Sequence, residues 1–358
     1  MHGRFAGIAL AVAASLALPG AAGAATKTVQ VGPYGERQAA FQKVFGDANA
    51  YFRKTVTIHK GDKVRWSING FHSVTFVPAD EQPPALIVPD PSTPVSGVND
   101  AAGSPFWFNG QPTLRPNPLA VAPQGGKTFS PNSLRNSGLP LGEGPPPPYT
   151  LRFKRKGTFR YLCVVHPGMT GKVKVVGADR SIPSARDDRR AARRQQNAAL
   201  QQVQRLTTGL GTEDLEKTIQ AGNDRRSGAT VFRFFPANPS YKVGDTVTLR
   251  MPAVSSEAHT FTFGPTNGKD AYNDQLAAGL LGEVFDPRGA YPSEPPPAGV
   301  PSITTAQHGN GFFNSGVLDQ DSASPQPAST KVTFGAPGTY QLICLIHPFM
   351  TNTVTVTP

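Results

Sequence analysis

Short runs in which apolar and polar residues alternate recur along this chain, and they predict β-strands rather than helices. Runs of this kind occupy residues 51–58, 63–66, 231–235, 240–243 and 246–250. A Gly-Asp turn lies inside the pattern of each half, at Gly61-Asp62 and at Gly244-Asp245. A later alternating run follows in each half and contains a histidine, at residues 71–76 and 258–263. The two halves therefore repeat one arrangement of strands.

The segment between the halves has a different composition and predicts helix. Residues 187–205 are rich in Arg, Gln and Ala, which are good helix formers. A second helical piece is expected at residues 213–220, with Thr212 as its N-cap. An apolar stripe that could dock on a β-domain is formed by Leu200, Val203 and Leu206.

Each half also contains a long Pro- and Gly-rich stretch, at about residues 78–148 and 265–327. The chain has 37 Gly and 36 Pro, which favours a turn-rich all-β architecture over a helical one. Loops of this length without regular structure are often functional or mobile. Both stretches contain the tripeptide Asn-Ser-Gly, at residues 136–138 and 314–316, which we interpret as a turn.

These patterns divide the 358 residues into four parts. We predict a signal peptide at residues 1–24, a first domain at 25–178, a basic and partly helical linker at 179–228, and a second domain at 229–358. The signal prediction rests on Arg4, the apolar run from Phe5 to Leu18 and the small residues Ala22-Gly23-Ala24. That run is short for a membrane span and no later stretch is longer. We expect an exported protein that is periplasmic, at the cell surface or secreted, with no transmembrane segment in the mature chain.

The formal net charge is +11, and arginines of the linker contribute much of it. Such a balance favours anionic partners, for example the acidic docking face of another protein. A solvated basic linker is the simpler interpretation of the Arg189, Arg190, Arg193 and Arg194 cluster. Nothing in the chain resembles a nucleic-acid-binding module, so no nucleic-acid partner is expected.

The clearest chemical signal is a cluster that occurs twice, Cys163-x-x-His166-x-x-Met169 and Cys344-x-x-His347-x-x-Met350. A thiolate, an imidazole and a thioether at this spacing suit a soft transition metal, above all copper. The chain has two cysteines in total, one in each cluster. A disulfide is the default expectation for two cysteines in an exported protein, but it would have to join equivalent positions of two domains. The repeat therefore favours two metal sites.

A type 1 copper site uses two imidazoles, one thiolate and a weak axial thioether, so each cluster needs a second histidine from another strand. His72 and His259 are the candidates, because each follows a Gly-Asp strand unit at a similar offset. An ordinary buried core histidine is the alternative for both. The proposed metal ligands are His72, Cys163, His166, Met169, His259, Cys344, His347 and Met350.

With these ligand sets, both halves resemble cupredoxins, the blue-copper proteins, and the C-x-x-H-x-x-M loop is most similar to that of amicyanin. The resemblance implies two tandem Greek-key β-sandwiches, each holding one copper ion. It also implies that His166 and His347 bring an imidazole edge near the surface as electron ports, with Gly168 and Phe349 close by. Two features depart from the family. Ser73 and Thr260 follow the first histidines where Asn is frequent, and long insertions could cover the copper edge or form a partner surface.

The function expected from this resemblance is one-electron transfer between redox partner proteins. Multicopper oxidases need His-x-His pairs, and none of the seven histidines forms one. Two-domain nitrite reductases need a histidine directly after the cysteine, where this chain has Val164 and Leu345. We therefore do not expect an enzyme. The alternative is a protein that stores, buffers or delivers copper, since thiolate and thioether also suit Cu(I).

Overall fold

The computed structural model describes residues 24–142, 144–208, 215–265, 273–280, 282–296, 299–321 and 324–358. The predicted signal peptide falls on residues 1–23, outside the described part, apart from its last residue.

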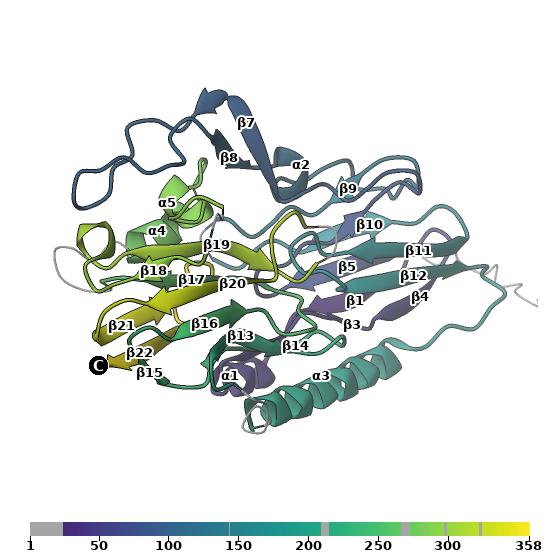
Figure 1. Ribbon diagram of the computed structural model, residues 1–358. Helices are drawn as coiled ribbons and strands as arrows, with labels where there is room; N and C mark the ends of the chain where they lie inside the picture. The colour runs from purple at the N-terminus through teal and green to yellow at the C-terminus, as the bar shows by residue number, and fades with distance from the viewer. Residues whose placement is uncertain are drawn as a thin grey trace, which may run out of the picture.

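The first half forms a sandwich of two sheets (Figure 1). One sheet has the order β10 (Tyr149–Arg152), β5 (Lys63–Ile68), β1 (Thr26–Val31) and β3 (Tyr51–Phe52). The other has the order β4 (Thr55–His59), β12 (Thr170–Val176), β11 (Gly157–Leu162), β6 (Thr75–Phe76) and β9 (Arg135–Asn136). The alternation of apolar and polar residues explains why the sheets pack face to face. In strand β5, for example, Val64, Trp66 and Ile68 point inward while their neighbours face outward. Inward residues of both sheets form one core around Trp66.

The second half repeats this architecture with a larger first sheet. That sheet has the order β18 (Ser302–Ile303), β20 (Ser329–Phe334), β16 (Thr246–Arg250), β13 (Thr218–Asp224), β14 (Ala229–Phe235) and β2 (Gly46–Ala48). The facing sheet has the order β15 (Ser240–Lys242), β22 (Thr351–Thr357), β21 (Gly338–Ile343), β17 (Ala258–Phe263) and β19 (Phe313–Asp319). The predicted all-β fold of two sandwiches is confirmed.

The structure corrects three of the predicted elements. The strand expected at residues 51–58 is two strands, because Arg53 has a φ of 50° and the chain passes from one sheet to the other there. In the run 71–76 only Thr75–Phe76 is a strand. The helix expected at residues 213–220 is wrong where it is described, because Thr218–Asp224 is strand β13 and pairs with β14 and β16. The second sandwich thus includes residues that the sequence pattern assigned to the linker.

The two sandwiches share a sheet. Strand β2 comes from the N-terminal part of the chain, but it pairs antiparallel with β14 at the edge of the second sandwich. Helix α1 (Glu36–Gln42) precedes it and buries Phe41. Next to β2, the backbone N–H of Asn49 donates to the Gly228 carbonyl at 2.7 Å. The halves are therefore continuous through backbone hydrogen bonds as well as through the linker.

The linker helix α3 (Ala185–Thr208) lies against both sandwiches (Figure 1). Near its N-terminus, the buried Asp188 carboxylate forms ion pairs with Lys27 at 2.6 Å and Arg53 at 3.1 Å, both from the first half. Near its C-terminus, Val203 and Leu206 pack in an apolar cluster with Val231 of β14. Leu200 packs against the same cluster, so the predicted helix is confirmed and its apolar stripe docks as expected.

The Pro-rich stretch of the first half forms an arm that lies on the second half. It contains the hairpin β7 (Ile87–Pro94) and β8 (Pro112–Pro116), and α2 (Pro118–Val121) follows. Phe106 and Phe108 between the two strands pack against Phe312 and Leu345 of the second half. The arm also contacts three short elements, α4 (Asn273–Gly279), α5 (Pro287–Ala290) and the 3-10 helix η2 (Gln307–Gly309).

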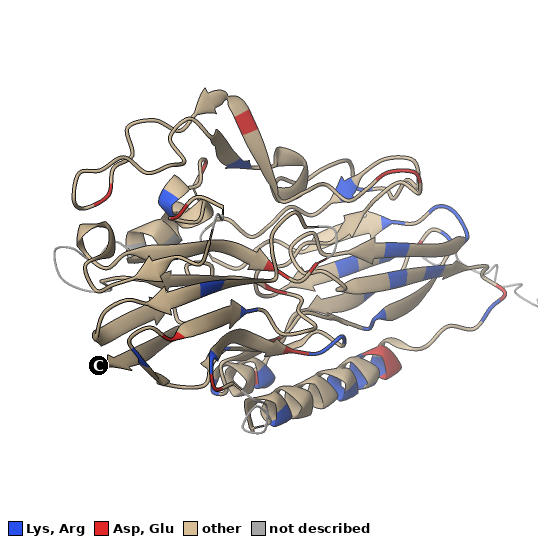
Figure 2. Cartoon of the chain, in the orientation of Figure 1, with Lys and Arg blue, Asp and Glu red and all other residues tan. Residues whose placement is uncertain are grey.

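Basic side chains occupy the strands of the first sandwich and the exposed side of α3 (Figure 2). Arg160 of β11 and Lys174 of β12 are exposed, as are the four arginines of the linker cluster. Among the described residues, no helix combines the length and the apolar character that a membrane span requires.

Candidate metal centres

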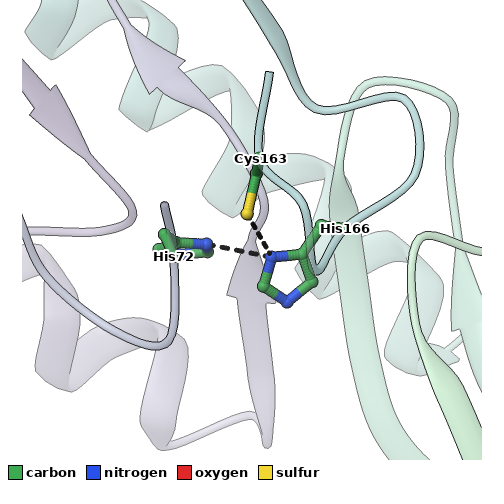
Figure 3. A group of neighbouring side chains, drawn as sticks. All are labelled: His72, Cys163 and His166. Carbon is green, nitrogen blue, oxygen red and sulfur yellow. Dashed lines mark hydrogen bonds between the residues drawn. The ribbon is translucent and has the colours of Figure 1, made fainter. Parts of the chain in front are cut away.

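The first centre brings together His72, Cys163 and His166, as Figure 3 shows. His72 lies just before β6, and the other two residues lie in the loop between β11 and β12. The His166 Nδ1 is 3.4 Å from the Cys163 Sγ and 3.1 Å from the His72 Nδ1. All three side chains are buried. The geometry places one sulfur and two Nδ1 atoms around a common point.

The second centre repeats this arrangement with His259, Cys344 and His347. His259 is on β17, and the loop between β21 and β22 carries the other two residues. The Cys344 Sγ lies 3.6 Å from the Nδ1 of each histidine, and the two Nδ1 atoms are 3.2 Å apart. In both centres the donor atoms lie within 4.8 Å of one another.

Met169 and Met350 close the two ligand loops. The Met169 carbonyl accepts from the Cys163 N–H at 3.1 Å, and the Met350 carbonyl accepts from the Cys344 N–H at 3.0 Å. Both methionine side chains are buried in the core cluster that contains the neighbouring cysteine. Their role as axial ligands stays a prediction.

The donor set fits copper. Two imidazole nitrogens and a thiolate form the trigonal part of a type 1 site. Burial raises the pKa of the Cys163 thiol, but His166 and His72 outweigh burial and hold that pKa well below its usual value. The same balance, with His259 and His347, lowers the pKa of Cys344. Both cysteines are free thiols, so neither is in a disulfide and both are available as metal ligands.

A glycine with positive φ lies against the first histidine of each centre. A Cβ on Gly32, whose φ is +71°, would meet the His72 Nε2 at 2.8 Å. A Cβ on Gly222, whose φ is +77°, would meet the His259 Nε2 at 3.0 Å. Neither Nε2 atom has a hydrogen-bond partner in the part of the chain that the structure describes. The two rings are therefore oriented by close packing and not by hydrogen bonds at Nε2.

Ser73 and Thr260, the residues that depart from the cupredoxin pattern, connect the ligand strand to the ligand loop. The Ser73 Oγ accepts from the Val164 N–H at 3.0 Å, and the Thr260 Oγ1 accepts from the Leu345 N–H at 2.8 Å. The backbone N–H of Ser73 donates to the Cys163 Sγ at 3.3 Å. The N–H of Thr260 donates likewise to the Cys344 Sγ at 3.4 Å. Hydrogen bonds to the cysteine sulfur tune the redox potential of such sites.

The repeated Asn-Ser-Gly tripeptide braces the same strand, a role that the sequence pattern did not predict. In the second half, the Thr262 hydroxyl lies 3.1 Å from the Thr260 hydroxyl and donates to the Asn314 Oδ1 at 2.9 Å. The Ser315 Oγ accepts from the Phe261 N–H at 2.9 Å. Equivalent bonds in the first half involve Ser73, Thr75, Asn136, Ser137 and Val74. The occurrence of the tripeptide at equivalent places in both halves is the sequence feature that could have indicated this role.

The expected position of an imidazole edge near the protein surface is wrong for His166, which is buried, whereas His347 is only partly buried. His166 is 5% exposed, and the His347 side chain is 13% exposed. Their Nε2 atoms face one carboxylate, that of Glu257, at 3.4 Å and 3.5 Å. The cause is the association of the two halves, which the repeat pattern could not reveal.

Glu257 is ionised in this environment. Burial raises its pKa, but His166, His347 and Asn49 outweigh burial and lower the pKa to about 2. Glu257 acts in turn on both rings. Burial lowers the pKa of each imidazole, but the neighbouring thiol and Glu257 raise the pKa of His166 to about 9 and that of His347 to about 10.

The remaining described histidines lie outside the centres. The His59 Nε2 is 2.8 Å from the Arg180 carbonyl. His308 lies between Asp100 of the arm and Glu294 of the second half, at 3.0 Å and 3.1 Å. His308 therefore connects the arm to the second half.

No family model matches this chain, and no curated protein matches it either. Similar solved structures include amicyanin from Paracoccus versutus, 15% identical over 42% of this chain and 87% of that chain, with a TM-score of 0.21. Plastocyanin from Dryopteris crassirhizoma is 20% identical over 39% of this chain and 99% of that chain, with a TM-score of 0.22. Auracyanin B is 19% identical over 39% of this chain and 87% of that chain, with a TM-score of 0.23. These structural neighbours are cupredoxins.

Proposed function

We propose that this chain is an exported tandem cupredoxin that holds two type 1 copper ions and carries single electrons between redox partner proteins. The observation that carries the proposal is the pair of buried His–Cys–His groups, with donor atoms within 4.8 Å in both halves. Each group would hold one ion through two Nδ1 atoms and a thiolate, with Met169 or Met350 as the weak axial ligand. The ion supplies the one-electron couple, and the packed strands keep its ligands in place.

A role in copper storage or delivery is the competing proposal, and burial of the sites argues against it. His166 is buried against Glu257 of the other half, and His347 is only 13% exposed, so a metal ion at either centre has little direct access to solvent. A carrier of electrons needs no such access. We propose a carrier and not an enzyme, because each imidazole of the two centres is used in a type 1 ligand set.

The test is a titration of the purified mature protein with Cu(II), followed by its visible spectrum and a count of copper per chain. We expect an intense thiolate-to-copper band that saturates at two ions per chain and a reversible redox couple. A colourless protein that binds only Cu(I) would contradict electron transfer and support storage.

Replacement of either cysteine gives a matched pair of controls. We expect Cys163→Ala and Cys344→Ala each to remove one copper ion and one thiolate band, because each thiolate serves a different centre. Copper counting and the visible spectrum of both variants check this. Loss of both bands in either variant would show that the two centres do not bind metal independently.

A further inference from the structure

The carboxylate of Glu257 lies between the two metal centres. Glu257 is in the loop between β16 and β17, two residues before His259, and it is 5% exposed. Its Oε1 is 3.4 Å from the Nε2 of His166, and its Oε2 is 3.5 Å from the Nε2 of His347. Each oxygen thus faces a ligand ring of a different centre.

The two rings present opposite edges to the metal site and to the carboxylate. The Nδ1 of His166 faces the Cys163 sulfur, and the Nδ1 of His347 faces the Cys344 sulfur. The Nε2 atoms on the far edges face Glu257. One imidazole, one carboxylate and a second imidazole therefore form a short path from one centre to the other. This path has two non-covalent steps, each between a nitrogen and an oxygen.

Neighbours from both halves hold Glu257 in this position. Asn49, which belongs to the first half, donates from Nδ2 to the Glu257 Oε1 at 2.6 Å and to the Ser256 Oγ at 2.9 Å. The Glu257 N–H donates to the Ser255 Oγ at 3.0 Å, and that hydroxyl donates to Asp224 at 2.7 Å. A hydrogen-bonded network of this kind fixes a buried charge.

The carboxylate breaks the repeat between the halves. The residue two positions before the first ligand histidine is Glu257 in the second half and Gly70 in the first. A Cβ on Gly70 would meet the His72 Nε2 at 3.2 Å, so the position leaves little room for a side chain in the first half. A buried carboxylate is costly unless it is paired, and Glu257 is paired with His166 and His347 in addition to its hydrogen bond from Asn49. Glu257 therefore belongs to one half of the repeat but contacts a histidine of both centres.

We propose that Glu257 is a positioning residue that couples the two metal centres, so that an electron received at one centre passes to the other within the chain. The inference rests on the proposed function. With both ions bound, the transfer would oxidise Cu(I) at one centre and reduce Cu(II) at the other, so it would need no bond made or broken and no further reactant. Tunnelling is faster through bonded and closely contacting atoms than across a gap, and the His166–Glu257–His347 path supplies such atoms.

The experiment uses the full copper-loaded chain with Met350→Gln as the parent, because a changed axial donor separates the band and potential of the second centre from those of the first. A pulse of reductant reduces a fraction of the centres, and the two bands are followed as electrons redistribute. The variants are Glu257→Ala and Glu257→Gln. Glu294→Gln is the matched control, since Glu294 also contacts a histidine between the halves but lies at His308.

We expect the parent and the Glu294→Gln control to show a redistribution phase whose rate does not depend on protein concentration. Glu257→Ala should lose this phase while both copper ions and both thiolate bands remain. An unchanged phase in Glu257→Ala would overturn the coupling role and leave the proposed function standing. A parent without thiolate bands would overturn the proposed function, and the inference with it.

A second measurement does not depend on redox activity. In the diamagnetic Cu(I) protein, nitrogen NMR of the imidazoles should show changed Nε2 resonances for both His166 and His347 in Glu257→Gln. The Glu294→Gln control should change only His308. A change confined to one of the two ligand rings would contradict the bridge, even if Glu257→Ala failed to fold.

Discussion

Gly32 and Gly222 show how strongly single positions constrain the two centres. Each glycine has a positive φ, and a Cβ at either position would lie within 3.0 Å of an imidazole of its centre. At Gly222 the register between β13 and β14 shifts, so the glycine lies in a bulge that turns the backbone toward His259. Because Gly222 has no side chain, the His259 ring can occupy the space beside it.

We expect Gly222→Ala to disturb the second centre specifically. The left-handed backbone alone costs about 1–2 kcal/mol for a residue with a Cβ, and the new methyl group would also push the His259 ring. The visible spectrum of the second centre should change, while the first centre keeps its band. Copper titration and denaturant unfolding of the variant measure the two effects.

Gly244→Ala is the matched control, because Gly244 has a φ of +86° but a Cβ there would meet nothing within 4 Å. It should lose a similar stability from backbone strain and leave both spectra unchanged. A normal second band in Gly222→Ala would show that the glycine does not position the ring.

The residues that form the two His–Cys–His groups could be predicted from sequence, and Glu257 could not, for a physical reason. Cys163 and Cys344 belong to a repeated spacing, so each copy supports the other. Glu257 corresponds to Gly70 in the first copy, and its partners are the distant residues Asn49 and His166. No periodic pattern records a contact between remote segments of a chain.

At the scale of elements, the arm that contains β7 and β8 packs on the second half, and its Pro-rich composition did not indicate which residues do so. That stretch predicted a long loop that could cover the copper edge or form a partner surface, and Phe106 and Phe108 fill an apolar cluster beside Leu345, the residue after Cys344. The Trp107 Nε1 donates to the Pro292 carbonyl at 2.9 Å, and the Tyr291 hydroxyl donates to the Pro112 carbonyl at 2.6 Å. The arm therefore covers one side of the second centre.

A charged contact near the arm makes its docking pH-dependent. Burial lowers the pKa of His308, but Glu294 and Asp100 raise it above its ordinary value of 6.5. The pKa of Asp100 is lowered from 3.8 despite burial, and the His308 contact lowers that of Glu294 from 4.5. A raised imidazole pKa stabilises the folded contact below about pH 6.5 and loses that contribution as pH rises through the raised value. The lowered pKa values of Asp100 and Glu294 stabilise the folded contact above about pH 4.5. This stabilisation is lost as the pH falls through the lowered pKa values.

We therefore expect the arm to be held best in mildly acidic solution and to loosen as pH increases above 6.5 toward the raised pKa of His308. Hydrogen exchange of residues 95–111 across a pH series, corrected for intrinsic exchange, measures this. His308→Gln should remove the increase in hydrogen exchange above pH 6.5. An unaltered pH profile in that variant would exclude His308 as the cause of the increase.

At the scale of the whole molecule, α3 and β2 join the two sandwiches into one folding unit. The helix forms ion pairs with the first half through Asp188 and packs on the second half through Leu206, which is 2% exposed. Two linked but separate domains would unfold in two steps. Shared buried surfaces of this kind predict one cooperative transition instead.

Leu206→Ala tests this expectation. Truncation of a buried leucine costs about 2–5 kcal/mol, and the loss should lower the unfolding midpoint observed at both copper bands together. Leu119→Ala, at a residue that is 51% exposed, is the control and should have little effect. A shift confined to the second band would mean that the halves unfold separately.

The exchanged strand β2 also has a consequence for the order in which the chain acquires its structure during synthesis. Gly46–Ala48 emerges early, but its partner strand, Ala229–Phe235, emerges only after the whole first sandwich and helix α3. An edge strand left without its partner exposes backbone groups that can pair with another chain. A fragment that ends before β14 would carry this open edge, so the ribosome must supply the whole first half, helix α3 and the first strands of the second half before β2 has its partner.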